Sequence, residues 1–431
     1  MEKVKYGYNK AEFKKFNSHA WRYLLLFSLL YCAHYCTRLN IGNAQVAMTE
    51  FAADDIGILS SVLFWTYGVG HLINGRLGEI VGIRKFIMLS VILSIIANVC
   101  MGFANSIPVM AVIWGFNGFF QSMAWSPGVS SLAAWWPNKR RGFATGFANA
   151  FSGFGQVAAT LMVALGFAVL PSLGWRSAFF LPAVLPLVLL IIYAIFAKTS
   201  PKDVGLNDYV EEDVVTAENE IEMQKIVKEK GVLFPYLHLL RNKTFWVWIF
   251  VIFASGVARY GLVTWIPKYL KDVAGLGDIV SLLTSTILPI GMGIGTLIVP
   301  TLTDKFCPHN RLIASVVSGL VAAGCVLGFM LLKPVGFQFV IMMILLFFAG
   351  FFIYAINGTV WTYAADVGGR VFSSTASGIL DFAAYMGAAI QSALYGFILV
   401  KGNWTVVFAS VAVFCFLIAL ISFIASRKKK A

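Results

Sequence analysis

The chain has 431 residues, of which 59% are hydrophobic and only 12% are charged, and its mean hydropathy is +0.80. An ordinary globular protein is about a quarter charged, so this composition excludes a soluble enzyme, a nucleic-acid-binding protein and a disordered scaffold, and predicts a polytopic membrane protein. The formal net charge of +13 then has to be explained by where the cations lie along the chain.

Twelve apolar runs are long enough to cross a membrane, because a bilayer core of ~30 Å needs about 20 apolar residues per helix. They lie at 22–48, 56–80, 85–104, 107–136, 140–169, 175–197, 244–270, 279–303, 311–332, 336–365, 371–400 and 402–426. The long polar stretch 198–243 separates the first six from the last six. We therefore predict an all-α membrane protein whose parts are an N-terminal segment (1–21), a six-helix bundle (22–197), a linker (198–243), a second six-helix bundle (244–426) and a basic tail (427–431).

The lysines and arginines predict the orientation of these spans, because cytoplasmic loops carry an excess of them. If the N-terminus is cytoplasmic, the outward loops hold, of the 33 Lys and Arg residues, only Arg176, Lys268, Lys271, Lys333 and Lys401. Arg38 and Arg259 lie inside spans, and all the others fall on the cytoplasmic side. Both termini and the linker of a multi-pass inner (cell) membrane protein are therefore expected in the cytoplasm. Residues 207–230 of the linker are highly charged and are expected to be mobile.

The two halves of the chain resemble each other. Residues 144–155, ATGFANAFSGFG, align without gaps with residues 376–387, ASGILDFAAYMG, which pairs the fifth span with the eleventh. A parallel repeat of two six-helix halves is the architecture of the major facilitator superfamily. The sequence therefore predicts that fold, with twelve transmembrane helices in two pseudo-symmetric bundles.

The loop between the second and third spans supports this prediction. Residues 75–85, GRLGEIVGIRK, resemble the G-x-L-x-D-x-x-G-x-R-R loop of that superfamily, with Glu79 in place of the aspartate. A carboxylate at a helix end that faces Arg84 and Lys85 would form a conformational latch, which breaks when the two halves move. The counterpart loop of the second half keeps Asp304. An ordinary charged turn is the alternative interpretation.

Two arginines lie inside predicted spans, where an ionisable side chain is costly and marks a candidate functional site. Arg38 lies in the first span and Arg259 in the seventh, which are equivalent helices of the two halves. Two guanidinium groups that face each other across a cleft repel until an anion binds between them, and each offers planar paired donors suited to a phosphate or carboxylate. Snorkelling, or pairing with a helix end, is the alternative. Tyr31 and Tyr35 share a helix face with Arg38 and either bind the substrate or pack.

Four stretches together resemble the organophosphate:phosphate antiporters of the superfamily, which include glycerol-3-phosphate and hexose-6-phosphate exchangers. They are the Tyr-x-x-x-Tyr-x-x-Arg pattern of the first span, Arg-Tyr-Gly-x-x-x-Trp-x-Pro-x-Tyr-Leu at 259–270, WSPGVSSLAAWWPNKRRG at 125–142 and GWRSAFFLPA at 174–183. The resemblance covers nearly the whole chain, and the stretch at 259–270 is its most specific part.

This resemblance implies roles for individual residues. The two span arginines, Arg38 and Arg259, would hold the phosphate group, and the tyrosines of the cleft would be Tyr31, Tyr35, Tyr67 and Tyr385. Two positions depart from the glycerol-phosphate type: His71 stands where such members have a lysine, and Ser152 where they have a histidine. These differences favour a hexose phosphate or a similar compound as the substrate.

Asp381 is a third ionisable residue within a span, one helical turn before Tyr385, and the internal alignment pairs it with Asn149. It could accept hydrogen bonds from the hydroxyl groups of a sugar, take up a proton, or form an ion pair with a span arginine in the empty carrier. A packing role is the alternative. His71 is a second candidate proton site. Among the remaining residues of the spans, the polar candidates for the cleft are Asn40, Asn117 and Gln121, and the tryptophans expected to pack are Trp125, Trp265 and Trp361.

The first functional hypothesis is a secondary transporter that exchanges an organophosphate for inorganic phosphate by rocker-switch alternating access. A proton-coupled symporter of another organic anion, such as a uronate or sulfonate, and a membrane sensor of sugar phosphate are the alternatives. We expect no enzymatic activity, cofactor or metal, because no P-loop, nucleophile–base constellation or metal-ligand spacing is present. The expected partners are the anionic phosphorylated substrate, inorganic phosphate and the lipid bilayer, without nucleic acid, around a monomeric chain.

Overall fold

The computed structural model describes residues 6–210, 225–227, 229–231, 233–307 and 310–428. Within these ranges the side chains at 75–76, 79, 138–139, 304, 365–366, 368–371 and 373–374 are not described. The main helices of the described residues are α1 (Lys10–His34), α2 (Asn40–Ala44), α3 (Ala53–Val81), α4 (Ile83–Phe103), α5 (Ile107–Ser122), α6 (Trp125–Trp135), α7 (Asn138–Val169), α8 (Ser177–Phe180), α9 (Val184–Phe196), α11 (Phe234–Leu240), α12 (Lys243–Asp272), α13 (Asp278–Ser285), α14 (Ile287–Phe306), α15 (Leu312–Leu331), α16 (Gly336–Val400) and α17 (Trp404–Lys428). Short 3-10 turns are η1 (Tyr35–Thr37), η2 (Pro171–Arg176), η3 (Leu181–Ala183) and η4 (Pro201–Val204).

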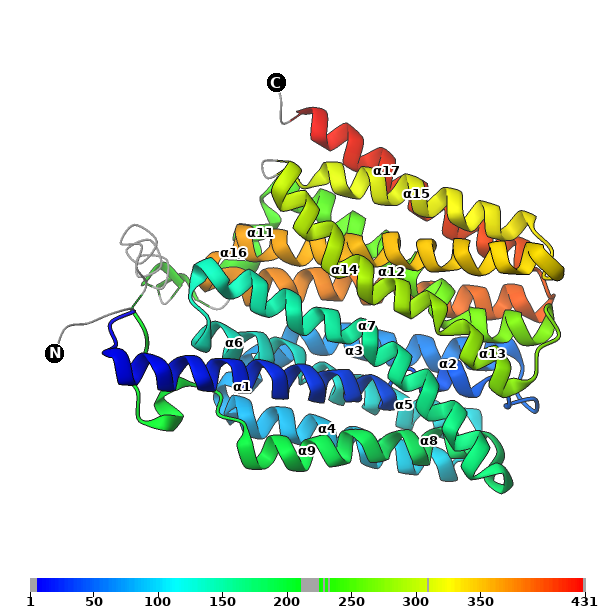
Figure 1. Cartoon of the computed structure of the whole chain (residues 1–431), viewed down its shortest axis with the longest axis horizontal. Coiled ribbons are helices and arrows are strands. Elements are labelled where there is room, and N and C mark those ends of the chain that lie inside the picture. Colours follow the sequence, from blue (N-terminus) through cyan, green and yellow to red (C-terminus); the bar gives the residue numbers. More distant parts are fainter. Residues whose placement is uncertain (1–5, 211–224, 228, 232, 308–309, 429–431) are drawn as a thin grey trace.

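The predicted twelve-span fold is confirmed. Eleven segments of the described chain are long and apolar enough to cross a membrane, and two of them, Gly336–Ala364 and Thr375–Val400, lie within α16. Figure 1 shows the chain reversing its direction between these two. The remaining span is the first, in which α1, η1 and α2 follow one another with a break at Arg38 and Leu39. Because of this break, the first span consists of α1, η1 and α2 rather than of one continuous helix.

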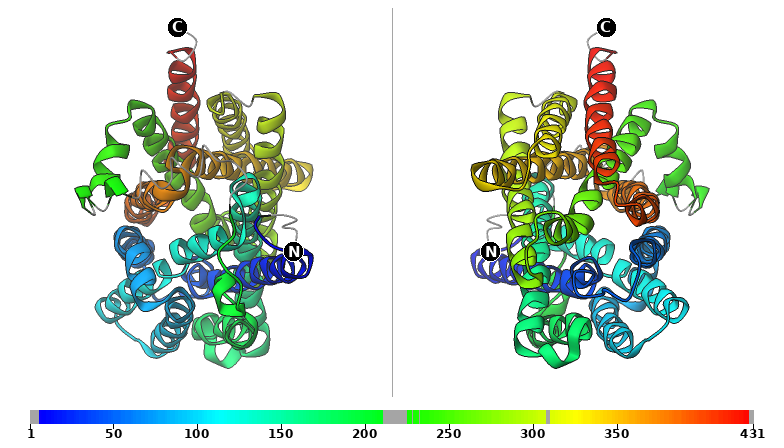
Figure 2. Two further views of the ribbon diagram at one scale, coloured as in Figure 1. Left: turned by 90° about the vertical axis from the view of Figure 1, so that its left-hand side faces the viewer. Right: turned by 90° about the vertical axis from the view of Figure 1, so that its right-hand side faces the viewer.

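The twelve spans form two bundles that follow the order of the sequence. Figure 2 shows the first six spans, coloured blue to green, on one side of the molecule and the later spans, coloured yellow-green to red, on the other. The bundles contact each other chiefly through α3 with α16 and through α7 with α14. At the second of these contacts the backbones approach closely, because a Cβ atom on Gly153 would lie 2.6 Å from the Cα of Gly293. The predicted pseudo-symmetric halves therefore meet along a surface that runs through the molecule.

The distribution of side chains is that of a protein surrounded by lipid. Large apolar side chains are widely exposed on the outside, for example Phe103 at 71% and Ile195 at 61%. In contrast, many amide and hydroxyl side chains are fully buried between the helices, among them Asn40, Asn74 and Asn117. Lipid tails solvate apolar surface but offer no hydrogen bonds, so polar groups within the spans are placed where protein groups can bind them.

The two bundles are closed against each other at the end that the charge pattern predicts to face outward. The Gln45 side chain donates a hydrogen bond to the carbonyl oxygen of Thr264 across the interface. Lys271 likewise donates to the carbonyl oxygen of Val46 and pairs with Asp278 at 2.8 Å. These contacts cover the interface beyond the arginines on this side of the molecule.

The described parts of the linker are anchored to the bundles. Tyr209, within the range predicted to be mobile, is buried, and its hydroxyl donates to the carbonyl oxygen of Ala133 at 2.9 Å. On the far side of the linker, Phe234 of α11 packs against Phe372 of α16 with ring centroids 6.3 Å apart. The remainder of the predicted mobile range lies mostly outside the described residues. Residues 207–210 therefore depart from the expectation, because an aromatic side chain finds a buried site there.

Candidate functional site

Arg38 lies at the break of the first span and is only 1% exposed. Its guanidinium carbon is 4.1 Å from the centroid of the Tyr35 ring and 4.7 Å from that of Tyr67. A guanidinium group held over aromatic faces gains cation–π energy without using its N–H donors. The Nε and Nη1 atoms of Arg38 are buried and find no hydrogen-bond partner among the described residues. The aromatic rings thus stabilise the charge while leaving donors free.

Arg259 has a similar environment in the second half. It lies in the middle of the continuous helix α12 and is 6% exposed. Its guanidinium carbon is 4.6 Å from the Tyr260 ring centroid and 4.3 Å from that of Tyr354. Its Nε and Nη2 atoms are also buried without a hydrogen-bond partner in the described part of the chain. Each half therefore presents one arginine flanked by two tyrosines.

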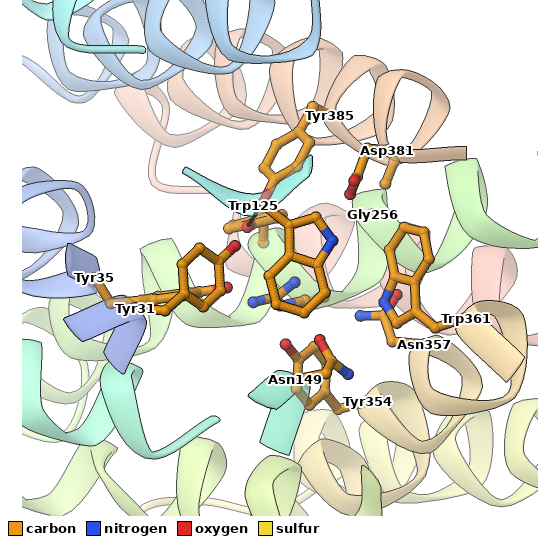
Figure 3. Close-up of a pocket in the computed structure, with 13 residues that line it drawn as sticks. Tyr31, Tyr35, Trp125, Asn149, Gly256, Tyr354, Asn357, Trp361, Asp381 and Tyr385 are labelled. Carbon is orange, nitrogen blue, oxygen red and sulfur yellow. Dashed lines mark hydrogen bonds between the residues drawn. The ribbon is translucent and has the colours of Figure 1, made fainter. Parts of the chain in front are cut away.

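A pocket lies between the two bundles at this level (Figure 3). Six residues predicted for the site line it: Tyr31, Tyr35, Asn149, Arg259, Asp381 and Tyr385. In Figure 3, Trp125 lies near the centre of the view, with Tyr31 and Tyr35 on one side and Trp361 and Asn357 on the other. Residues from both halves thus surround one space, as alternating access requires.

Arg38 and Arg259 do not border this space equally. Arg259 lines the pocket, whereas Arg38 lines a smaller neighbouring cavity together with Ser60 and Thr264. Tyr35 is close to both arginines. Its ring makes the cation–π contact with the Arg38 guanidinium, and it also lines the pocket beside Arg259. The expected arrangement has both guanidinium groups facing each other across one cleft. In the structure, Tyr35 lines the pocket where Arg38 was expected.

Tyr67, His71 and Ser152 lie next to the pocket without being among its lining residues. Tyr67 packs against the pocket residue Tyr385 with ring centroids 4.1 Å apart. The His71 ring is stacked at 5.9 Å on Tyr385, and its Nδ1 is 3.7 Å from Oδ2 of Asp381. The spacing of four residues between Tyr67 and His71, and between Asp381 and Tyr385, places each pair on one helix face. The two faces meet across the interface of the halves.

Ser152 makes a second contact between the halves. Its hydroxyl forms a hydrogen bond with the hydroxyl of Tyr354, whose ring makes a cation–π contact with Arg259. Ser152 also donates to the carbonyl oxygen of Asn149 at 2.5 Å. A side chain of the first half therefore orients an aromatic ring that supports the arginine of the second half.

Several pocket residues were missed or misjudged from the sequence. Trp125 and Trp361 were expected to pack but line the pocket, whereas Trp265 is fully buried in the core of the second half. The lining residues that the prediction omitted are Gly256, Tyr260, Tyr354, Asn357 and Ala384. A signal was available on the tenth span, because Tyr354, Asn357 and Trp361 stand at the spacing of one helix face. Asn40, Asn117 and Gln121 are not among the lining residues and serve another part of the molecule.

The structure describes the side chains of only some residues of the predicted latch. The side chains of Glu79 and Asp304 lie outside the described residues. Arg84 is half-buried and donates a hydrogen bond to the carbonyl oxygen of Ala194, and Lys85 is exposed. Arg84 therefore binds a helix end of the sixth span, whatever its relation to Glu79.

Comparison with known proteins now identifies the class. The Major Facilitator Superfamily profile matches residues 26–391. A solved structure, that of a bacterial homolog of the human lysosomal transporter Spinster, has a TM-score of 0.70 at 17% identity and covers 95% of this chain and 97% of its own. The chain therefore belongs to the major facilitator superfamily and is a multi-pass membrane transporter, not an enzyme.

Three relatives are similar to the chain over most of its length. A probable hexose phosphate transport protein of Chlamydia trachomatis is 26% identical over 419 residues, covering 94% of this chain and 90% of the relative. The glycerol-3-phosphate transporter of Bacillus subtilis is 27% identical over 390 residues, covering 87% and 85%. The membrane sensor protein UhpC of Escherichia coli is 25% identical over 401 residues, covering 91% and 89%. The predicted resemblance to the organophosphate:phosphate antiporter family is confirmed.

Proposed function

We propose that this transporter exchanges a sugar phosphate for inorganic phosphate by rocker-switch alternating access. The observation that carries the proposal is the pair of buried arginines, one from each half, with unpartnered N–H donors beside a pocket between the halves. Burying a charge is costly unless an opposite charge accompanies it. Among the described residues, neither Arg38 nor Arg259 forms an ion pair with a carboxylate. A bound dianion would supply that missing partner.

The remaining pocket residues support a polyhydroxylated organic part. Trp125 and Trp361 offer broad apolar ring surfaces, and Asn149, Asn357 and Asp381 offer hydrogen-bond donors and acceptors. Apolar faces combined with polar groups at the edge match a sugar, whose rings have C–H faces and a rim of hydroxyl groups. The phosphate would lie at the arginine and tyrosine end, and the sugar towards the indoles and Asp381.

In this proposal the phosphate group couples binding to movement. Arg38 belongs to the first bundle and Arg259 to the second, so an anion held by both draws the bundles together, and this contact helps offset the cost of closure. Phosphate arriving from the other side resets the carrier without proton movement or ATP. From the distribution of Lys and Arg we also infer that both termini lie in the cytoplasm. We further propose that the chain works as a monomer in the inner (cell) membrane. The bundles 22–197 and 244–426 would be the moving units.

The direct test is counterflow in proteoliposomes. Vesicles loaded with labelled phosphate should lose the label when an external sugar phosphate is added, and should retain it when buffer alone is added. Exchange should persist when both sides are clamped at one pH. Failure of every organophosphate to release labelled phosphate would overturn the proposal.

A proton-coupled symporter of an organic anion is the second candidate, and the contact between His71 and Asp381 favours it. Their Nδ1 and Oδ2 atoms lie 3.7 Å apart, longer than a hydrogen bond, so the halves would have to move slightly closer for a proton to pass between them. Such a carrier would accumulate a uronate or sulfonate in response to an imposed pH gradient, without internal phosphate. The third candidate, a sensor like the protein named above, would bind sugar phosphate but show neither uptake nor exchange.

A further inference from the structure

The first span is interrupted immediately before and after Arg38. Helix α1 ends at His34, the 3-10 turn η1 covers Tyr35–Thr37, and Arg38 has φ −123° and ψ −46°, outside the helical values. A break of this kind frees backbone carbonyl oxygens from their normal N–H partners. Within the hydrocarbon core such groups cannot turn to water, so other protein groups must bind them.

Side-chain amides bind carbonyl oxygens at this break. The carbonyl oxygen of Thr37, the residue before Arg38, accepts one hydrogen bond from the Asn98 amide and one from the Asn117 amide, each at 2.8 Å. The carbonyl oxygen of His34 accepts a bond from Gln121 at 3.2 Å and one from the Thr37 hydroxyl at 3.0 Å. Asn98, Asn117 and Gln121 are completely buried. Two primary amides therefore converge on a single backbone atom next to the arginine.

These amides are themselves fixed by further hydrogen bonds. Ser94 donates to the Asn117 oxygen at 2.6 Å and accepts from Gln121 at 2.7 Å. Asn40 donates to the Asn98 oxygen at 2.7 Å and to the carbonyl oxygen of Ala178 at 2.8 Å. The resulting network joins the first, third, fourth and sixth spans, all within the first half. We call it the amide clamp and define it by Thr37, Asn40, Ser94, Asn98, Asn117 and Gln121.

We propose that Asn98 and Asn117 are positioning residues for Arg38: by holding the Thr37 carbonyl they keep the first span broken and Arg38 seated between Tyr35 and Tyr67. Neither amide is among the residues that line the pocket, so neither is expected to contact the substrate itself. The seventh span needs no such device, since α12 runs unbroken through Arg259. The inference rests on the proposed function only for the choice of phosphate as the probe.

The test compares Asn117→Leu and Asn98→Leu with Asn74→Leu as a matched control. Leucine has nearly the shape of asparagine but cannot donate a hydrogen bond. Asn74 is also completely buried in the first half, but its amide binds Ser122 at 2.6 Å rather than the broken turn. Each variant is purified, and its folding is checked by gel filtration and thermal unfolding.

Two measurements distinguish positioning from general stability. Hydrogen–deuterium exchange of the peptide around residues 34–42 should be faster in Asn117→Leu and Asn98→Leu and unchanged in Asn74→Leu. Calorimetry should show phosphate binding up to about fivefold weaker in the two clamp variants, the order of effect that one hydrogen bond can have. If hydrogen–deuterium exchange of this peptide in the two clamp variants is as slow as in the wild type, the proposal is overturned, whatever the phosphate affinity.

A double-mutant cycle separates this inference from the proposed function. If Asn117 acts through Arg38, then Asn117→Leu should weaken phosphate binding much less in the Arg38→Lys background, but by its full amount in the Arg259→Lys background. Full loss in both backgrounds would overturn the positioning role while leaving the arginines as ligands. If neither lysine variant alters phosphate binding, the proposed function fails. The hydrogen–deuterium exchange of residues 34–42 alone then decides whether the amide clamp holds the turn.

Discussion

The two arginines occupy equivalent spans but are held in different ways. Arg38 lies on an interrupted helix whose free carbonyl oxygens are bound by amides of its own half. Arg259 lies on a continuous helix, and one of the rings that flanks it, Tyr354, is hydrogen-bonded to Ser152 of the opposite half. The backbone beside the first arginine is therefore held within its own bundle, although the Tyr67 ring packs on Tyr385 of the second half. Beside the second arginine, the Tyr354 ring is bound by a hydroxyl group of the first half. We therefore expect the backbone at Arg38 to keep its hydrogen bonds when the halves move, and the Tyr354 ring beside Arg259 to lose its bond to Ser152.

The largest expected effect comes from the arginines themselves. Arg38→Lys and Arg259→Lys each keep a positive charge but replace a planar paired donor set with a point charge. Each should weaken phosphate binding by ~2–3 kcal/mol, on the order of 30- to 150-fold. Calorimetric titration of folded wild type and variants with phosphate measures this. Near wild-type affinity in either variant would remove that arginine from the proposed ligands.

The contact across the interface should affect movement more than binding. Tyr354→Phe keeps the ring over Arg259 but removes the hydroxyl group that bonds Ser152. Losing one hydrogen bond of ~1 kcal/mol should change the exchange rate by about fivefold with little change in phosphate affinity. The paired change Ser152→Ala should give the same rate, and combining the two should add nothing. Additive losses in the double variant would show that the two hydroxyl groups act separately.

Asp381 lies on the sugar side of the proposed site, so its replacement should discriminate between substrates. Asp381→Asn keeps the shape and hydrogen-bonding capacity but removes the charge. Phosphate-for-phosphate exchange should persist, and exchange of sugar phosphate for phosphate should change in KM. Transport assays with both substrates measure the difference. Unchanged kinetics for every substrate would assign Asp381 a packing role.

The smallest effect is expected in the linker. A short tag inserted after Glu218 should leave exchange within about twofold of the wild type, because the described segments on either side are anchored separately. Tyr209 is bound to the first bundle, and α11 packs against α16 of the second. Exchange in proteoliposomes and thermal unfolding report the result. Complete loss of folding would count against the division into two bundles joined by a linker.

The sequence by itself determined the membrane class, the twelve spans and the two arginines. Long apolar runs are unambiguous because the bilayer sets their length, and a charged residue inside such a run stands out against its neighbours. Tyr31 and Tyr35 of the first span could also be assigned, because their spacing of four residues predicts a common face, and both line the pocket. These signals are local, so they can be read without knowing how the helices pack.

Only the tertiary structure decided what each polar or aromatic side chain faces. Trp361 and Trp265 look alike in the sequence, but the first lines the pocket and the second lies in the core of its bundle. Asn117 and Gln121 were expected in the cleft, but they bind the carbonyl oxygens of Thr37 and His34 at the break of the first span. The amides that bind at this break belong to the third and fourth spans and lie more than fifty positions from Thr37 in the chain. Such interactions follow from packing between helices, which the pattern within any one helix does not contain.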